Sequence, residues 1–346
     1  MKESFQHLIA GPCSAETREQ VLATAKELAE IKELTYFRAG IWKPRTAPGS
    51  FEGIGKEGLN WLKEAKDQFG LKTITEVATP EHVEACLKTG VDALWIGART
   101  TVNPFYVQQI ADSLKGVDIP ILVKNPISPD VGLWMGAIER FKLAGSSNVA
   151  VIHRGFFSYS KGVFRNPPMW EIPIKLKTEF PDLEIICDPS HISGDAGMIE
   201  EVSKFAMQLG MNGLMIESHP APKEAWSDAK QQVTPDRLKE IVQAILTHKA
   251  HKAIKQDELI SLRQDIDLAD RKALIEISNR MQIVRDIAQY KKENSATVFQ
   301  IERWKHVLEE SKKQAAELGL SEEFIEDLMN LIHKESLHIH HLIYNS

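Results

Sequence analysis

The chain has 346 residues, which is long for one domain and comfortable for two. Its formal net charge of −6 argues against a nucleic-acid partner, and no run approaches the ~18 consecutive apolar residues of a membrane span. The first residues lack the apolar core of a signal peptide, and three cysteines do not make a disulfide framework, so we expect a cytoplasmic protein.

Eight short apolar runs of β type lie within residues 1–220, and stretches with helical apolar spacing separate them. In chain order the runs are 8–14, 36–40, 72–77, 93–99, 121–125, 149–155, 184–190 and 213–218. This alternation predicts an α/β fold, a (β/α)8 barrel with its active site at the carboxyl ends of the strands. The trailing ends of the runs supply residues that can bind or react, namely Cys13, Arg38, Glu76, Arg99, Lys124, Arg154, Asp188 with His191, and Glu217. A ring of this kind indicates an enzyme rather than a barrel retained as a scaffold.

The composition changes sharply near residue 235. All 16 prolines lie at or before Pro235, and 19 of the 20 glycines precede it, so turn-forming residues give way to a helical composition. We expect the barrel to occupy 1–247, with its last helix at 236–247, and a partly helical linker at 248–256. An all-α domain of three helices should follow at 257–346, with helices at 257 to about 293, roughly 298–317 and roughly 321–343.

The first helix of the expected C-terminal domain carries an apolar stripe over about 36 residues, or about 54 Å. Two shorter helices of the same chain cannot cover that length, so we expect a homodimer in which a second copy packs on the stripe. The alternative is a solvent-exposed coiled-coil arm.

Four potential metal ligands fall on the rim of strands one, seven and eight and the loop that follows strand eight. A thiolate, an imidazole and two carboxylates suit a divalent transition metal such as manganese, cobalt, iron or zinc. Each residue alone has a structural interpretation, and Cys86 and Cys187 are interpreted as buried small apolar groups. The set occurs in the motifs GPCS, DPSH, IESHP and WSDA and comprises Cys13, His191, Glu217 and Asp228.

Six cationic side chains are also expected on the rim: Arg38, Lys43, Arg45, Arg99, Lys124 and Arg154. So many positive charges in one mouth would repel one another without ligands, so the substrates should be strongly anionic. Phosphate and carboxylate groups fit because arginine can bind each of them through two hydrogen bonds. The alternative, pairing with neighbouring carboxylates, would account for one or two of the six.

The motifs GPCS, FRAGIWKPRT, GART, VKNP, HRGF, DPSH and ESHP with SDAKQ closely resemble those of the 3-deoxy-D-arabino-heptulosonate 7-phosphate (DAHP) synthases. The resemblance covers the whole barrel and is to the short type I subfamily. It implies condensation of phosphoenolpyruvate with erythrose 4-phosphate, the first step of the shikimate pathway, at a site that holds a metal through the four ligands above. The related 3-deoxy-D-manno-octulosonate 8-phosphate synthases are the alternative, but the KPRT form of residues 43–46 favours the four-carbon sugar.

The resemblance also implies a role for each cation. Arg99 and Arg154 would bind the phosphate of phosphoenolpyruvate. The carboxylate and reacting centre would contact Arg38, Lys43 and Lys124, with Glu76 also in the substrate site. Lys43 would in addition transfer a proton. The phosphate of erythrose 4-phosphate would bind Arg45 and Thr46.

The helical domain resembles the all-α chorismate mutases, which convert chorismate to prephenate. The resemblance implies a catalytic set of Arg263, Arg280, Lys291, Arg303, Ser336 and His340. Arg263 and Arg280 are 17 residues apart, or about 25 Å along one helix, so each site should take Arg263 from the partner copy.

Three positions depart from the mutase pattern: Gln300 and Trp304 flank Arg303, and His340 replaces a common Gln. A non-catalytic sensor or dimerisation module therefore remains the alternative for this domain. A mutase site fused to a first pathway enzyme also predicts feedback inhibition of the barrel by prephenate or chorismate.

Overall fold

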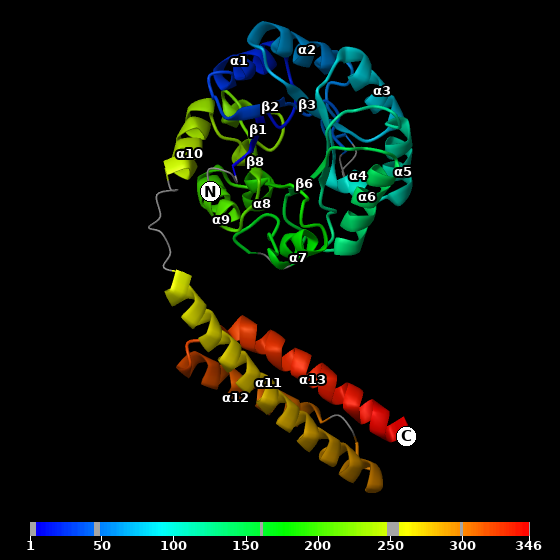
Figure 1. Ribbon diagram of the computed structural model, residues 1–346, viewed down its shortest axis with the longest axis vertical. Helices are drawn as coiled ribbons and strands as arrows, with labels where there is room; N and C mark the ends of the chain where they lie inside the picture. Colours follow the sequence, from blue (N-terminus) through cyan, green and yellow to red (C-terminus); the bar gives the residue numbers. More distant parts are fainter. Residues whose placement is uncertain (1–4, 45–48, 160–161, 248–255, 298–299, 346) are drawn as a thin grey trace. The chain divides into compact units, whose positions relative to one another are not determined.

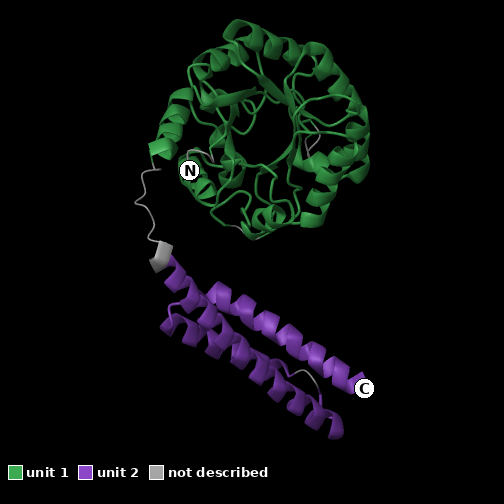
Figure 2. Cartoon of the chain, viewed as in Figure 1, with its two compact units in different colours: residues 1–250 green, residues 251–346 purple. Residues whose placement is uncertain are grey.

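The structure is a computed structural model that describes residues 1–346 except 1–4, 45–48, 160–161, 248–255, 298–299 and 346. The chain forms two compact units, Met1–Ala250 and His251–Ser346 (Figure 2). The predicted linker 248–256 lies almost wholly outside the described residues. Among the helices that are described, none has the length and apolarity needed to cross a lipid bilayer.

Eight parallel strands close the first unit into a barrel in the order β1 to β8 (Figure 1). The predicted (β/α)8 architecture is therefore confirmed. Each strand pairs with its neighbour in sequence, and β1 closes the sheet against β8 through Leu8–Leu214 and Ala10–Ile216. The strands are β1 His7–Gly11, β2 Leu34–Arg38, β3 Thr73–Val77, β4 Ala93–Ile96, β5 Ile121–Lys124, β6 Val149–His153, β7 Ile185–Cys187 and β8 Gly213–Glu217.

Helices surround the barrel, and residues with strong capping preferences mark their ends. Thr79 caps α3, whose first residue is Pro80, and Gly90 ends that helix in a left-handed conformation at φ 81°. The α-helices are α1 Arg18–Leu28, α2 Glu57–Phe69, α3 Pro80–Thr89, α4 Ala98–Thr101, α5 Pro104–Ser113, α6 Val131–Leu143, α7 Glu171–Glu179, α8 Pro189–Ser193, α9 Ile199–Gln208 and α10 Pro235–Thr247. Short 3₁₀ turns are η1 Ala196–Met198, η2 Pro222–Glu224 and η3 Ala229–Gln231.

Two apolar layers support the barrel. The larger one fills the space between the strands and the surrounding helices. Side chains that point into the barrel interior form the smaller one, which comprises Ile9, Ile74, Ala93, Trp95, Leu122, Ala150, Ile152, Ile186 and Met215. The filled interior leaves only the ends of the strands and their loops for binding.

The second unit is all-helical, as predicted, with α11 Gln256–Glu293, α12 Ile301–Glu317 and α13 Glu322–Asn345. Helix α13 packs against both other helices (Figure 1). The small core of buried Met281, Val284 and Ile339 involves only the C-terminal half of α11. The side chains of α11 from Ile260 to Glu276 are exposed within one chain.

Candidate functional site

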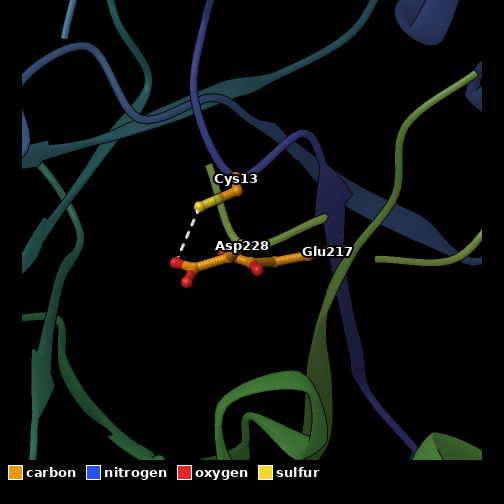
Figure 3. Close-up of side chains that lie close together, drawn as sticks. All are labelled: Cys13, Glu217 and Asp228. Atoms are coloured by element: carbon orange, nitrogen blue, oxygen red, sulfur yellow. Dashed lines mark hydrogen bonds between the residues drawn. The ribbon is translucent and has the colours of Figure 1, made fainter. Parts of the chain in front are cut away.

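Three potential metal ligands converge at the carboxyl end of the barrel. Cys13 follows β1, Glu217 ends β8, and Asp228 precedes η3. Their ligand atoms lie within 4.8 Å of one another, and Cys13 Sγ donates to Asp228 Oδ2 at 3.4 Å (Figure 3). The sequence placed all three on the same rim, although more than 200 residues separate Cys13 from Asp228 along the chain.

His191, the fourth predicted ligand, lies beside this group in α8. Its Nε2 is 3.8 Å from Glu217 Oε1, and its Nδ1 is 2.8 Å from Asp188 Oδ2. Burial lowers the pKa of His191 despite the nearby carboxylates, so the ring is neutral at physiological pH. A neutral imidazole held by a carboxylate on one nitrogen presents the other to a metal, which is the usual arrangement of histidine ligands.

The thiol and the carboxylates of this group differ in their protonation state. Burial, reinforced by Glu217, raises the pKa of Cys13 to about 12, so the thiol keeps its proton. Burial alone would raise the pKa of Asp228, but His191 and Arg165 beside it hold that pKa well below its usual range. The pKa of Glu217 is likewise lowered, because His191 and Arg38 outweigh the effect of burial. Both carboxylates are therefore ionised and available as ligands.

A pocket next to these ligands has four cations among its ten lining residues. Its walls comprise Lys43, Pro44, Glu76, Gly97, Ala98, Arg99, Lys124, Arg154, His191 and Asp228. Burial lowers the pKa of Arg154 to about 10, with Arg165 and Arg99 adding to the effect, yet the guanidinium stays charged at neutral pH. The Lys43 ammonium donates to Cys13 Sγ at 3.1 Å, so the cationic pocket adjoins the sulfur ligand.

Two of the predicted cations already have carboxylate partners. Lys124 donates to Asp188 Oδ2 at 2.8 Å, and Arg38 donates to Glu217 Oε1 at 3.1 Å. Arg38 is buried and does not line the pocket, which differs from the expectation that all six cations face the mouth. Arg45 and Thr46, predicted for the sugar phosphate, lie outside the described residues.

The ring of Trp95 lies against two of these cations, Arg38 and Lys124, which the sequence did not indicate. The ring of this buried β4 residue lies 4.9 Å from Arg38 Cζ and 5.8 Å from Lys124 Nζ, within the range of cation–π attraction. Its Nε1 donates to Glu76 Oε2 at 3.1 Å. Glu76 fits only because Gly97 follows β4, since a Cβ there would overlap the carboxylate.

Arg165 and Gln231 also belong to the site and were missed. Arg165 donates to Asp228 Oδ1 at 3.0 Å and to Gln231 Oε1 at 2.6 Å. Gln231 lay within the SDAKQ motif but has no charge, and Arg165 follows no strand end. The spacing of residues around the strands therefore carried no signal for either.

In the second unit, Arg280 and Ser336 come together across α11 and α13. Arg280 Nη1 donates to Ser336 Oγ at 2.8 Å. His340 is buried one turn further along α13, and its pKa is lowered by burial and then by Lys291 and His333. Arg280 and Lys291 of α11 therefore lie near Ser336 and His340 of α13, whereas Arg263 and Arg303 are exposed on α11 and α12.

The departures from the mutase pattern also have defined positions. Gln300 is the residue before α12, and it caps the helix without a side-chain hydrogen bond. Trp304 stacks on His333 of α13, with ring centroids 4.1 Å apart and an interplanar angle of 18°. Trp304 thus joins α12 to the helix that carries Ser336 and His340.

Comparison with known proteins identifies both parts of the chain. Residues 3–255 match the model of the DAHP synthetase I family, and residues 262–341 match that of chorismate mutase type II. A phospho-2-dehydro-3-deoxyheptonate aldolase of Thermotoga maritima is 33% identical over 236 residues, which cover 68% of each chain. A 2-dehydro-3-deoxyphosphooctonate aldolase of Wolinella succinogenes is 27% identical, with 69% of this chain and 97% of that protein covered.

Solved structures agree with this result. The crystal structure of the Thermotoga maritima DAHP synthase superposes with a TM-score of 0.63 at 29% identity, covering 70% of this chain and 68% of that one. A truncated form of the Thermotoga maritima enzyme gives 0.61 at 27% identity, covering 70% and 86%. The chain therefore belongs to the DAHP synthetase I family, carries a type II chorismate mutase domain after its barrel, and is a bifunctional enzyme that combines a transferase with an isomerase.

Proposed function

We propose that the barrel condenses phosphoenolpyruvate with erythrose 4-phosphate and that the helical unit converts chorismate to prephenate. The observation that carries the first reaction is the cationic pocket directly beside Cys13, Glu217 and Asp228. Two phosphorylated substrates, one of which also has a carboxylate, match a pocket walled by Lys43, Arg99, Lys124 and Arg154 in charge and chemistry.

Cys13, His191, Glu217 and Asp228 would hold a divalent metal. One sulfur, one nitrogen and two carboxylate donors fit manganese, iron, cobalt or zinc, and the ring of His191 is held by Asp188 as metal-binding histidines usually are. Such an ion supplies Lewis-acid polarisation of the aldehyde oxygen. We expect the metal to bind the thiolate form of Cys13, so binding should release a proton.

The chain's own residues would bind and orient the substrates. In the reaction, C3 of phosphoenolpyruvate bonds to the aldehyde carbon, water adds at C2, and inorganic phosphate leaves. Arg99 and Arg154 would hold the departing phosphate, and Lys124 the carboxylate, so that the reacting carbon is fixed in the pocket. Lys43 lies on the pocket wall beside Cys13, where its ammonium could deliver a proton to the new hydroxyl oxygen.

The choice of sugar rests on KPRT at residues 43–46, of which Arg45 and Thr46 would bind the phosphate of erythrose 4-phosphate. The curated octulosonate relative at 27% identity makes arabinose 5-phosphate the competing acceptor. Parallel assays with the two sugars and phosphoenolpyruvate decide the question. Turnover that is faster with arabinose 5-phosphate would refute our assignment.

The metal assignment is tested by removal and return of the ion. Chelation should abolish synthase activity, and added manganese or cobalt should restore it in the wild type but not in Cys13→Ala or His191→Ala. Cys86→Ala is the matched control, because Cys86 is another fully buried cysteine but lies on α3 away from the ligands. Full activity of Cys13→Ala in chelated buffer would contradict the assignment.

For the mutase, Arg280, Lys291, Ser336 and His340 would form a cationic pocket that holds the reactive conformer of chorismate and stabilises charge on the ether oxygen. The hydrogen bond from Arg280 to Ser336 supports this grouping. Arg303 would complete the set from α12. Prephenate formation by the full chain, and its loss in Arg280→Ala, would distinguish an active mutase from a sensor without turnover.

We also propose a homodimer through the helical unit. Six large apolar side chains of α11 before Glu276 are between 48% and 67% exposed, namely Ile260, Leu262, Ile266, Leu268, Leu274 and Ile275. Within one chain, Arg263 lies about 25 Å along the helix from Arg280 and cannot reach its pocket. A second copy that covers the apolar side chains would bring its own Arg263 to that pocket. Light scattering that gives a monomer at micromolar concentration would refute this assembly.

Feedback control follows from the same pocket. We expect prephenate or chorismate to bind there and inhibit the barrel, with coupling of roughly five- to 150-fold between two states of the enzyme. Arg280→Ala should weaken inhibition and mutase activity together, whereas Arg285→Ala, an exposed arginine on the same helix, should change neither. Deletion of 257–346 should abolish inhibition, and an equally inhibited barrel would place the sensor elsewhere.

The compartment we expect is the cytoplasm, where the three free cysteines would stay reduced.

A further inference from the structure

Both carboxylates in the group of potential metal ligands accept hydrogen bonds from neighbouring side chains. Glu217 accepts on Oε2 from Gln231 and on Oε1 from Arg38, and its Oε1 also lies 3.8 Å from His191 Nε2. Asp228 accepts on Oδ1 from Arg165, while its Oδ2 lies 3.4 Å from Cys13 Sγ. The oxygens nearest His191 and Cys13, Glu217 Oε1 and Asp228 Oδ2, are thus the ones that Gln231 and Arg165 do not hold.

Gln231 connects the two carboxylates. Its Nε2 donates to Glu217 Oε2 at 2.8 Å, and its Oε1 accepts from Arg165 Nη1 at 2.6 Å. The same Arg165 nitrogen donates to Asp228 Oδ1 at 3.0 Å. The result is a continuous chain of hydrogen bonds from Glu217 through Gln231 and Arg165 to Asp228.

The position of Gln231 makes this connection rigid. The side chain is buried, with 1% of the residue exposed, so both ends of the amide are satisfied inside the protein. Gln231 is also the last residue of η3, and its backbone N–H donates to the carbonyl of Asp228 at 3.1 Å. Asp228 itself has a left-handed backbone at φ 49°, which few non-glycine residues adopt, so the surrounding bonds hold it in place.

We propose that Gln231, acting with Arg165, is a positioning residue that selects which carboxylate oxygens face the metal. The inference rests on the proposed metal site at Cys13, His191, Glu217 and Asp228 and adds residues that bind no metal themselves. An amide suits this position because its N–H orients Glu217 without adding charge, while its carbonyl holds Arg165 against Asp228. Groups that orient metal ligands in this way typically change metal affinity roughly ten- to a hundred-fold when they are removed.

The role predicts a difference between metals. Gln231 and Arg165 act only on the oxygen ligands, and oxygen donors matter most to manganese, whereas thiolate and imidazole dominate zinc binding. Gln231→Met, which keeps the length of the side chain and loses both hydrogen bonds, should weaken Mn²⁺ binding roughly ten- to a hundred-fold. The loss for Zn²⁺ should be less than about tenfold, because the sulfur and nitrogen donors remain in place.

The experiment measures Mn²⁺ and Zn²⁺ binding by calorimetry on metal-free, full-length protein. Wild type and Cys13→Ala are titrated first. If the wild type fails to bind one Mn²⁺, or if Cys13→Ala binds Zn²⁺ as tightly as the wild type, the proposed metal site is wrong. If that site holds but Gln231→Met binds Mn²⁺ like the wild type, only the positioning role is refuted. Equal losses for Mn²⁺ and Zn²⁺ would also overturn it, because they would indicate general damage to the fold.

Two further variants complete the design. Gln108→Met is the matched control, since Gln108 likewise bridges a carboxylate, Asp112, and an arginine, Arg140, but does so on α5 at the surface. It should leave both metal affinities unchanged. Arg165→Met alters a half-exposed side chain of the same hydrogen-bond chain and decides the question if Gln231→Met does not fold. We expect it to weaken Mn²⁺ more than Zn²⁺, and unchanged Mn²⁺ binding would refute the proposal.

Discussion

His153 at the end of β6 should make the barrel sensitive to acid. The side chain is fully buried among aromatic rings, with centroids of Trp134, Phe156 and Trp170 at 6.3, 5.7 and 5.2 Å. Burial, with the neighbouring charge of Arg154, lowers the pKa of His153 to about 3 from an ordinary 6.5. The folded barrel therefore carries a neutral imidazole between about pH 6.5 and pH 3, where an unfolded chain would protonate it.

The magnitude follows from this difference in pKa. Between pH 6.5 and 3, His153 binds a proton in the unfolded state but not in the folded state. The free energy of unfolding therefore falls as the pH is lowered through this window. At pH 5 the loss relative to pH 8 is about 2 kcal/mol. It depends almost entirely on the unfolded pKa, because any folded pKa below about 4 yields nearly the same value at pH 5.

His153→Phe removes the titrating group and keeps an aromatic side chain among aromatic neighbours. Urea unfolding of wild type and variant at pH 8 and pH 5, followed by tryptophan fluorescence, gives the four free energies needed. Six of the seven tryptophans lie in the barrel, so the signal reports mainly that unit. Any loss of stability common to both pH values cancels in the comparison.

The drop in unfolding free energy from pH 8 to pH 5 should be about 2 kcal/mol smaller in His153→Phe than in the wild type. His338→Phe, which replaces an exposed histidine of the helical unit, should leave the drop of the barrel unchanged. An equal drop in wild type and His153→Phe would refute the reasoning, because His153 would then be protonated as readily in the folded barrel as in the unfolded chain.

The other predictions concern the two reactions. Arg45→Ala should raise the Michaelis constant for erythrose 4-phosphate by roughly thirty- to a hundred-fold, since a lost charge-assisted hydrogen bond costs about 2–3 kcal/mol. Equal increases in the Michaelis constants of both substrates would show that Arg45 does not bind the phosphate of erythrose 4-phosphate specifically. If the imidazolium of His340 donates to the ether oxygen, mutase turnover should fall as the pH rises through its pKa. That pKa lies below 6.5 because of burial and Lys291, so turnover at pH 5 should exceed that at pH 7. His340→Gln should retain activity with a flat profile, and a wild-type profile that is already flat from pH 5 to 8 would exclude this role.

The sequence by itself determined the architecture and most of the residues at the rim. Apolar runs of strand length, separated by helical stretches, predict a parallel barrel because each run can bury both faces only in such a sheet. The residue that ends a run must then lie at the carboxyl edge, which is why Cys13, Lys124, Arg154 and Glu217 could be assigned to one mouth. The loss of proline and glycine after residue 235 likewise predicted the helical unit.

Only the tertiary structure decided which of these groups touch. Arg38 and Glu217 are 179 residues apart, and their buried pairing depends on the closure of the barrel, which no local pattern encodes. Closure buries Arg38 against Glu217, so that it does not line the pocket, and brings the Trp95 ring within cation–π distance of Arg38 and Lys124. The spacing of residues around the strands carried no signal for Gln231 or Arg165, because an uncharged amide and a loop arginine acquire a role only from the carboxylates that the fold sets beside them. Hydrogen bonds act over about 3 Å, so they are fixed by final positions in space and not by order along the chain.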